Sequence, residues 1–348
     1  MRQRPRRLWL ERLRSQGVTG PAATTVYDVV DQLLAVQAQD LRGARLAIRA
    51  RSTGVAAADV DAAINDGSLV VGWLNRGTLH LVARDDYWLL HALTTPQLAA
   101  GNTTRLRQLG IDADAAERGV QAILRALEAD GPLLRTELRD RVDAAGVLAD
   151  GHSMYHLPLL ALLRGDIVRG PLRGREQTWA LTADWLPPRP TTIDRDEALA
   201  GLARRYLVGH GPAADGDLAR WAGVTLRDAR AGLSAIQDEL AERADGLAAL
   251  KGRDARLSSP KPRLLGAFEP MLLGWTSRED VLAATAAKRL ITDNGLFRPF
   301  LFVDGQARGL WRINGKRVEL EPFEPLDDDV TATLTTDAED VVRFLGLS

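Results

Sequence analysis

Apolar residues recur at helical spacing through most of the chain, and two Gly-Pro pairs interrupt this pattern. The first pair, Gly131-Pro132, ends a run that begins near residue 115, and the second, Gly211-Pro212, ends a run that begins near residue 195. Because glycine and proline break helices, each pair marks the end of one helix before a second, shorter one. The pairs lie 80 residues apart, and this spacing predicts a tandem repeat of whole domains.

Runs rich in apolar and β-branched residues predict hairpins after these helices. Two such runs, around Val168 and Trp179, flank a turn rich in Gly, Pro and Arg. Another hairpin is predicted over residues 69–82, after helices near residues 8–14, 25–36 and 42–51. Three helices followed by a hairpin form the winged-helix arrangement, which is related to the helix-turn-helix folds that bind DNA.

The composition changes after Lys261, where strand-like runs alternate with short turns. Asp304-Gly305 and Asn314-Gly315 are typical two-residue hairpin turns. We therefore predict an α+β chain, mainly helical, with three tandem winged-helix units and a β-rich C-terminal module. The predicted domains are residues 1–114, including a helical linker, and residues 115–190, 191–260 and 261–348.

Composition narrows the class of protein. Of the 348 residues, 45% are hydrophobic and 26% are charged, which is typical of a globular protein. No apolar run reaches the roughly 18 residues that a membrane helix needs, so we expect a cytoplasmic location. Cysteine is absent, which excludes disulfides and thiolate metal sites. His152 and His156 have i, i+4 spacing but no intervening glutamate, so we expect no metal site.

The charges are unevenly distributed although the net charge is only −1. The segment from Met1 to Arg51 contains ten arginines and four acidic residues, whereas the segment from Glu319 to Asp340 contains nine acidic residues and no Lys or Arg. Such polarity is compatible with a basic face that binds phosphates, and equally with ordinary solvated surfaces.

The common enzyme motifs are missing. The sequence contains no GxxxxGK[ST] phosphate loop, no GxGxxG between a strand and a helix, and no GxSxG nucleophile turn. This argues against a nucleotide cofactor and against a conventional serine hydrolase.

The triplet Gln37-Ala38-Gln39 follows the apolar helical run and precedes a series of arginines. Residues i and i+2 of a helix do not share a face, so two amides serving one site require the helix to end or unwind at Gln37. The alternative is that one amide caps or bridges helices while the other meets water. Asp40 is expected first as a helix cap or as a partner of Arg42 or Arg45.

Four segments together resemble the AlkZ-type family of bacterial winged-helix DNA glycosylases. They are AVQAQDLRGARLAIRARS, WLNRGTLHLVARDD, RYLVGHGPAADGDLARWAG and NGLFRPFLFVDGQARGLW, and the resemblance spans about residues 6 to 311. It implies three winged-helix units around a basic surface and a catalytic Gln-X-Gln triplet, which places these roles on Gln37 and Gln39. It also implies a monofunctional glycosylase without a cofactor, which excises N7-alkylated purines from double-stranded DNA and unhooks interstrand cross-links. We expect a monomer associated with the nucleoid.

Further DNA contacts are expected around the motif, on the hairpin of the first unit and on a C-terminal hairpin like that of the family. The candidates are Arg42, Arg45, Arg49, Arg51, Arg76, Thr78, His80, Arg298 and Arg308. Among them, His80 is alternatively a structural histidine, and some arginines are expected to be solvated or paired. A winged-helix regulator without catalysis is the main alternative function, and a protein-interaction scaffold that uses the acidic C-terminal end is a third.

Overall fold

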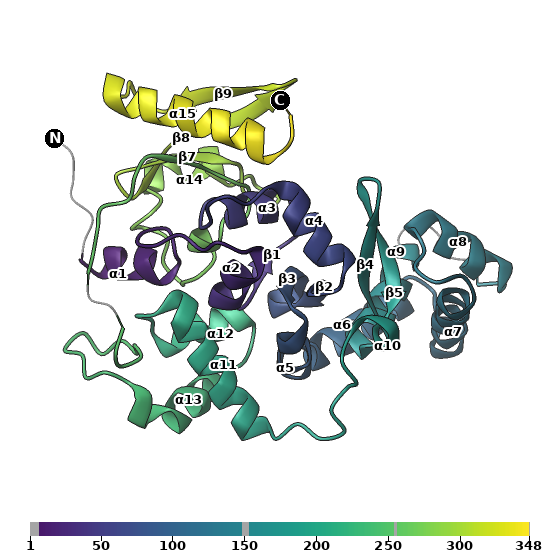
Figure 1. Cartoon of the computed structure of the whole chain (residues 1–348). Coiled ribbons are helices and arrows are strands. Elements are labelled where there is room, and N and C mark those ends of the chain that lie inside the picture. The colour runs from purple at the N-terminus through teal and green to yellow at the C-terminus, as the bar shows by residue number, and fades with distance from the viewer. Residues whose placement is uncertain (1–6, 148–152, 254–255, 348) are drawn as a thin grey trace. The chain divides into compact units, whose positions relative to one another are not determined.

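The computed structural model describes residues 7–147, 153–253 and 256–347, which divide into two compact units (Figure 1). Unit 1 contains the residues up to Val60 together with those from Asp196 onward, and unit 2 contains Asp61–Arg195. This division differs from the four expected domains, because N-terminal and C-terminal segments pack together in unit 1. The helix α4 (Ala57–Asn65) contains one boundary between the units.

Unit 1 begins with helices that are close to those expected from the sequence. Its elements are α1 (Arg7–Ser15), α2 (Val26–Leu33), β1 (Val36–Gln37), α3 (Leu41–Arg49), α11 (Arg195–His210), α12 (Asp215–Ala222), α13 (Leu226–Ala235), η3 (Gln237–Glu239), β6 (Arg263–Leu265), η4 (Pro270–Leu272), α14 (Ala284–Leu290), β7 (Phe300–Val303), β8 (Gln306–Asn314), β9 (Arg317–Pro322) and α15 (Asp328–Phe344). The helix α11 ends directly before Gly211-Pro212, as predicted. Gly223 has a left-handed φ of 76° and is the C-cap at which α12 ends.

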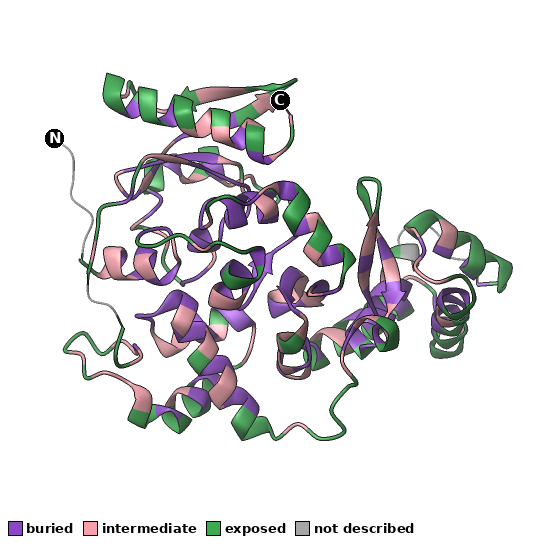
Figure 2. Cartoon of the chain, viewed as in Figure 1, coloured by how far each residue is buried: buried purple, intermediate pink, exposed green. Residues whose placement is uncertain are grey.

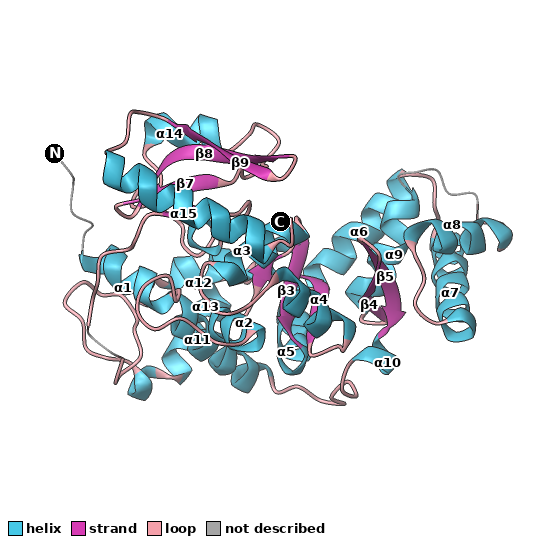
Figure 3. Cartoon of the chain, turned by 45° about the horizontal axis from the view of Figure 1, so that its top comes forward, coloured by secondary structure: helices cyan, strands magenta, loops and turns pink. Residues whose placement is uncertain are grey.

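The β-rich segment of unit 1 forms an antiparallel sheet with the strand order β6-β7-β8-β9. Asp304-Gly305 joins β7 to β8, as expected. The two-residue turn between β8 and β9 is Gly315-Lys316, one residue later than expected, because Asn314 still belongs to β8 and pairs with Arg317. Figure 3 shows α15 running alongside these strands. Its buried residues recur along one side, while the opposite side is exposed (Figure 2). The helix therefore buries its apolar stripe on the fold. Asp328, Asp329 and Glu339 are exposed, whereas Asp337 faces unit 1 and pairs with Arg49.

Unit 2 contains the other predicted hairpins. Its elements are β2 (Leu69–Leu74), η1 (Asn75–Gly77), β3 (Thr78–Ala83), η2 (Arg84–Asp86), α5 (Tyr87–Thr94), α6 (Pro96–Gln108), α7 (Ala113–Asp130), α8 (Arg135–Ala144), α9 (Ser153–Arg164), β4 (Ile167–Arg173), β5 (Glu176–Leu181) and α10 (Thr182–Trp185). Its strands have the order β3-β2-β4-β5, and Val71 pairs with Arg169. The two hairpins expected in separate winged-helix units thus share one sheet.

The core of unit 2 lies between this sheet and the helices α6 to α9. Val120, Ile123, Leu138 and Leu157 are completely buried there, and Trp179 packs partly against them. These are apolar positions at helical spacing, so the pattern that predicted the helices also supplies the residues that hold them together.

Candidate active site

The Gln37-Ala38-Gln39 segment lies between two helices and is not helical itself. The helix α2 ends at Leu33, and the next residue, Leu34, has a φ of 64° that no continuing helix allows. Val36 and Gln37 are extended, and α3 begins after Asp40. The helix therefore ends before both glutamines, which is the condition for two amides to serve one site.

Asp40 is the N-cap of α3, as expected. Its carboxylate accepts a hydrogen bond of 3.0 Å from the backbone N–H of Arg42. This contact satisfies an N–H group that a helix start would otherwise leave without a partner. Asp40 therefore fixes the place at which α3 begins, directly after the second glutamine.

Glycines hold both flanking helices in close backbone contacts within unit 1. A Cβ at Gly209 of α11 would lie 2.5 Å from the carbonyl oxygen of Gln32, at the end of α2. A Cβ at Gly43 of α3 would lie 2.4 Å from the carbonyl oxygen of Ala267. Both distances are shorter than any real carbon–oxygen contact, so only glycine allows these backbones to approach. The segment that carries the two glutamines is thereby fixed at both ends.

The two glutamines differ in exposure. Gln37 is 8% exposed and the neighbouring Ala38 is 4% exposed, whereas Gln39 lies at the surface. One amide is thus mostly enclosed by protein, and the other is open to solvent and to any ligand.

The four arginines after the motif fall into two groups. Arg42 is exposed and Arg45 is partly exposed. Arg49 and Arg51 are buried, with 5% and 2% of their surface exposed. Arg49 pairs with Asp337 at 2.6 Å, and Arg51 pairs with a buried glutamate.

This corrects the expectation that Arg49 and Arg51 contact DNA. Arg49 is the last residue of α3 and Arg51 follows the helix, and carboxylates of unit 1 already neutralise both. The acidic residues that pair with them come from more than 200 positions later in the chain. Sequence alone does not reveal such partners: Asp337 lies in the acidic C-terminal segment, and Glu269 lies outside it.

In unit 2, the candidates expected on the hairpin, Arg76, Thr78 and His80, occupy two kinds of structure. Arg76 lies in the turn η1 with a left-handed φ of 55°, so it does not belong to the strand. Thr78 and His80 lie on β3, two residues apart and therefore on one face. Thr78 is partly exposed, whereas His80 is only 1% exposed.

His80 has the environment of a structural histidine. Its Nδ1–H donates to the carbonyl oxygen of Thr78 at 3.0 Å. Burial, together with the nearby charge of Arg76, lowers the pKa of His80 to about 3. The ring is therefore neutral at pH 7, and its alternative role as a structural residue is the one that this geometry favours.

Asn75, beside these residues, was missed by the sequence analysis. Its side chain is completely buried, and neither amide atom has a hydrogen-bond partner among the described residues. Only burial distinguishes it from an ordinary turn asparagine, so no sequence signal pointed to it.

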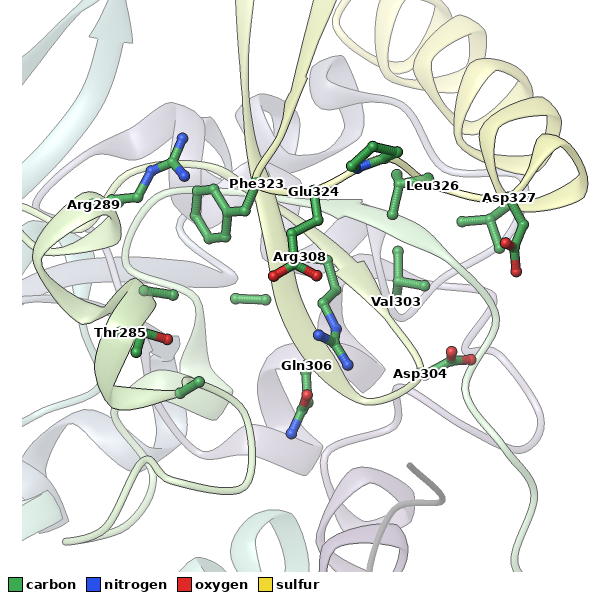
Figure 4. Close-up of a pocket in the computed structure, with 15 residues that line it drawn as sticks. Thr285, Arg289, Val303, Asp304, Gln306, Arg308, Phe323, Glu324, Leu326 and Asp327 are labelled. Atoms are coloured by element: carbon green, nitrogen blue, oxygen red, sulfur yellow. The ribbon is translucent and has the colours of Figure 1, made fainter. Parts of the chain in front are cut away.

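The expected C-terminal contacts lie in different places. Arg298 is exposed, just before β7. Arg308 lies on β8 and lines a cavity of about 450 Å³ beside α14 and the segment before α15 (Figure 4). The turn between β7 and β8 does not project, because Trp9 donates a hydrogen bond of 2.8 Å to the carbonyl oxygen of Gly305. The hairpin of residues 298–308 is therefore packed into the fold.

The turn between β8 and β9 is the exposed one. Its solvent-exposed residues are Arg312, Asn314, Gly315, Lys316 and Arg317. Arg312 pairs with Glu319 at 2.6 Å. Arg312, Lys316 and Arg317 lie close to Asn314-Gly315 in the sequence, and this cluster of cations is the signal from which an exposed basic turn could have been predicted.

Two further findings concern the described part of the chain. Over residues 7–147, 153–253 and 256–347, no group of three or more His, Asp or Glu side chains is placed to hold a metal ion. His152 lies outside the described residues, and His156 contacts Asn102 Oδ1 at 2.6 Å. No helix in the described ranges is both long and apolar enough to span a membrane.

Comparison with known proteins gives a consistent result. The family model of DNA glycosylase AlkZ-like proteins matches residues 30–344. An interstrand DNA cross-link repair glycosylase of Streptomyces sahachiroi is 29% identical over 363 aligned positions, which cover 95% of this chain and 92% of the relative. The solved structure of Streptomyces sahachiroi DNA glycosylase AlkZ superposes with a TM-score of 0.79 at 26% identity, covering 100% of this chain and 98% of that one. The family match covers nearly the whole length of the chain. The chain therefore belongs to the AlkZ-like family of DNA glycosylases and is an enzyme of that class.

Proposed function

We propose that this chain is a monofunctional DNA glycosylase of the Gln-X-Gln type, which removes N7-alkylated purines from double-stranded DNA. The observation that carries the proposal is the position of Gln37 and Gln39 in a fixed, non-helical segment inside the region matched by the glycosylase family. The family supplies the reaction class, and the triplet supplies the candidate residues. The reaction needs no second subunit, so we expect a monomer.

The chemistry suits neutral side chains. Alkylation at N7 gives the purine a positive charge, so the base leaves readily when the bond from N9 to C1′ of the sugar breaks. The bonding electrons stay with the base and neutralise its charge. A water oxygen bonds to C1′, the proton of that water passes to solvent, and an abasic site remains. A strong general acid is unnecessary, and no cofactor takes part.

We assign the two amides to positioning and electrostatic stabilisation. An amide has no useful pKa near neutrality, so neither glutamine is a strong general base. Amide carbonyl oxygens accept hydrogen bonds from a water and oppose the positive charge that develops on the sugar. Gln37 is 8% exposed, so its dipole acts in a medium that screens less than water. Gln39 is exposed and available to the substrate directly.

We propose cationic side chains of unit 1 as the phosphate contacts. They are Arg42, Arg45 and Arg298, together with Lys316 and Arg317 of the exposed turn between β8 and β9. Arg76 and Thr78 remain candidates in unit 2. Phosphate contacts of this kind position the duplex without reading its sequence.

The substrate proposal extends to bulky adducts. The relative from Streptomyces sahachiroi is named for the repair of interstrand cross-links. We infer that the present chain also unhooks such cross-links, either in general DNA repair or in self-resistance to a genotoxic metabolite. We therefore expect the enzyme to act on the nucleoid in the cytoplasm.

The test uses duplexes that contain N7-methylguanine or bulkier N7 adducts, and it scores alkali-labile abasic sites under single-turnover conditions. We expect release by the native chain and losses of about 100-fold in Gln37→Ala and Gln39→Ala, with binding to undamaged DNA retained. Gln237→Ala, at an exposed position of unit 1, is the matched control.

Two outcomes would overturn the proposal. Absence of release from every alkylated duplex, together with salt-dependent DNA binding, would indicate a DNA-binding protein without catalysis. Release that is unchanged in both glutamine variants would remove Gln37 and Gln39 from the active site.

A further inference from the structure

A short, well-fixed loop follows α14 in unit 1. Ile291 and Phe297 form an antiparallel bridge at its base. The backbone N–H of Thr292 donates to the carbonyl oxygen of Leu296 at 2.9 Å, and the N–H of Leu296 donates to the hydroxyl of Thr292 at 3.0 Å. Gly295, with a φ of 78°, closes the turn through a bond of 2.9 Å to the carbonyl oxygen of Thr292. These three hydrogen bonds therefore hold a turn of only a few residues.

This loop presents an apolar side chain to solvent. Leu296 is 49% exposed, the highest value among the large apolar side chains that are exposed in the described part of the chain. A single exposed leucine is common and needs no explanation. Leu296 differs because it lies on one arm of a loop whose own hydrogen bonds fix it, opposite Thr292, so its position is set before any partner arrives.

Packing connects the base of the loop to the start of α3. The ring of Phe297 lies 5.6 Å from the ring of Phe268. Phe268 has a left-handed φ of 54° and follows Ala267, whose carbonyl oxygen lies against Gly43 in the first turn of α3. That helix begins two residues after Gln39. A short series of contacts within unit 1 thus connects Phe297, the neighbour of Leu296, to the helix that follows the glutamines.

Two cations lie near this leucine in the chain or against its neighbour. Arg298 follows Phe297 and is exposed. The guanidinium of Arg278 lies 5.4 Å from the centre of the Phe297 ring. The tip of the loop itself is polar, with Asp293 and Asn294 exposed. An exposed apolar side chain with cations close by matches the requirements of a side chain that enters the stacked bases beside the phosphate backbones.

We propose that Leu296 is the wedge that enters the base stack of duplex DNA and occupies the space left by the extruded nucleotide. This inference rests on the proposed function and concerns adducts on one strand, whose nucleotide leaves the stack before a glycosylase reaches its bond. Extrusion costs a few kcal/mol of unstacking, which an apolar side chain offsets when it fills the gap. A fixed loop suits this role because little further ordering is needed on binding.

The first test compares Leu296→Ala with Leu226→Ala, a second leucine of unit 1 that is 42% exposed at the start of α13. Single-turnover excision of N7-methylguanine is measured in a fully paired duplex and in an unpaired loop. We expect Leu296→Ala to slow excision about tenfold in the duplex and less than twofold in the loop, where no extrusion is needed. Leu226→Ala is expected to change neither rate.

A second measurement does not depend on catalysis. The fluorescence of 2-aminopurine, placed next to a stable abasic analogue in a duplex, reports unstacking when the protein binds. The native chain is expected to raise this fluorescence, and Leu296→Ala is expected to lose most of the rise at saturating protein. If no alkylated base is released by the native chain but the rise depends on Leu296, the proposed function fails while the wedge stands.

Other results would overturn the wedge. Equal losses on the paired and unpaired substrates would assign Leu296 to folding or to the chemical step, and unchanged rates and fluorescence would exclude it from the DNA interface. Asp293→Asn gives an independent reading, because removing a negative charge near phosphates raises affinity. We expect DNA binding to tighten about twofold to fivefold at low salt and the gain to shrink with added salt. Unchanged affinity would place the loop away from the duplex.

Discussion

The guanidinium of Arg51 and the carboxylate of Glu269 meet at 2.5 Å inside unit 1, where 2% and 0% of the two side chains are exposed. The same guanidinium donates to the amide oxygen of Gln16 at 2.9 Å. This ion pair connects the residues after α3 to the segment after β6. Because α3 begins beside the candidate catalytic glutamines, the pair is part of the framework on which their position depends.

Removing one member of this pair is expected to destabilise the fold strongly, because the other charge stays buried without its partner. For Glu269→Ala we expect a loss of about 3–5 kcal/mol in the free energy of unfolding, measured by urea denaturation. The double variant Arg51→Met/Glu269→Leu is expected to recover most of this loss, since no buried charge remains. A loss below about 1 kcal/mol in the single variant would contradict the importance of the pair.

The close approach of α3 to the segment after β6 makes a second prediction. A Cβ at Gly43 would lie 2.4 Å from the carbonyl oxygen of Ala267, so Gly43→Ala must displace α3 or that segment. We expect a stability loss of about 1–3 kcal/mol by denaturation and a lower excision rate. The control is Gly216→Ala in α12, where a Cβ meets no atom within 4 Å. It is expected to be neutral or stabilising by up to about 1 kcal/mol, and equal losses in both variants would refute the steric explanation.

The difference in burial between Arg42 and Arg49 predicts different effects on DNA binding and on stability. Arg42 is exposed, so Arg42→Ala is expected to weaken binding to all duplexes and to lower the salt slope by about 1. Arg49 pairs with Asp337, so Arg49→Ala is expected to cost about 3 kcal/mol of stability with the slope unchanged. Titrations at several salt concentrations, with denaturation of each variant, measure both quantities. A reduced slope in folded Arg49→Ala would restore it as a phosphate contact.

The buried histidine predicts how stability depends on pH. The pKa of His80 is lowered from 6.5 to about 3, so the folded chain keeps the ring neutral while the unfolded chain protonates it below pH 6.5. Stability is therefore lost as the pH falls from 6.5 towards 3. His80→Gln is expected to lose stability less steeply over this range, by about 1.4 kcal/mol per pH unit.

The comparison with the native chain isolates this effect, because the pKa of His91 is also lowered, to about 4, and it contributes in both proteins. Denaturation at a series of pH values between 7 and 4 measures the two slopes. Equal slopes would mean that His80 is protonated in the folded state as readily as in the unfolded one.

The sequence correctly predicted structural features that depend on only a few neighbouring residues. The breakers Gly131-Pro132 and Gly211-Pro212 marked helix ends because their effect is intrinsic to the backbone. Asp40 was identified as a helix cap because a cap needs only the next turn of chain. The resemblance carried by four segments identified the family, which the family model confirms.

The sequence did not show which arginines are exposed and which are buried in ion pairs. Arg42 and Arg49 lie seven residues apart on one helix and look equivalent in the sequence, yet one is exposed and the other pairs with Asp337. Burial and pairing depend on partners that the fold brings from distant positions. The same reason explains the turn at Asp304-Gly305, which has ordinary hairpin chemistry but is held by Trp9 from the other end of the chain.

The chain by itself therefore determined the main helices, the turn at Asp304-Gly305, its family and the helix cap at Asp40, because each depends on backbone preferences or on short motifs. Only the tertiary structure decided that Gln37 is enclosed while Gln39 is open, and that Leu296 stands exposed on a fixed loop. These properties arise from contacts between segments that are far apart in sequence, and no local pattern records which surface another segment will cover.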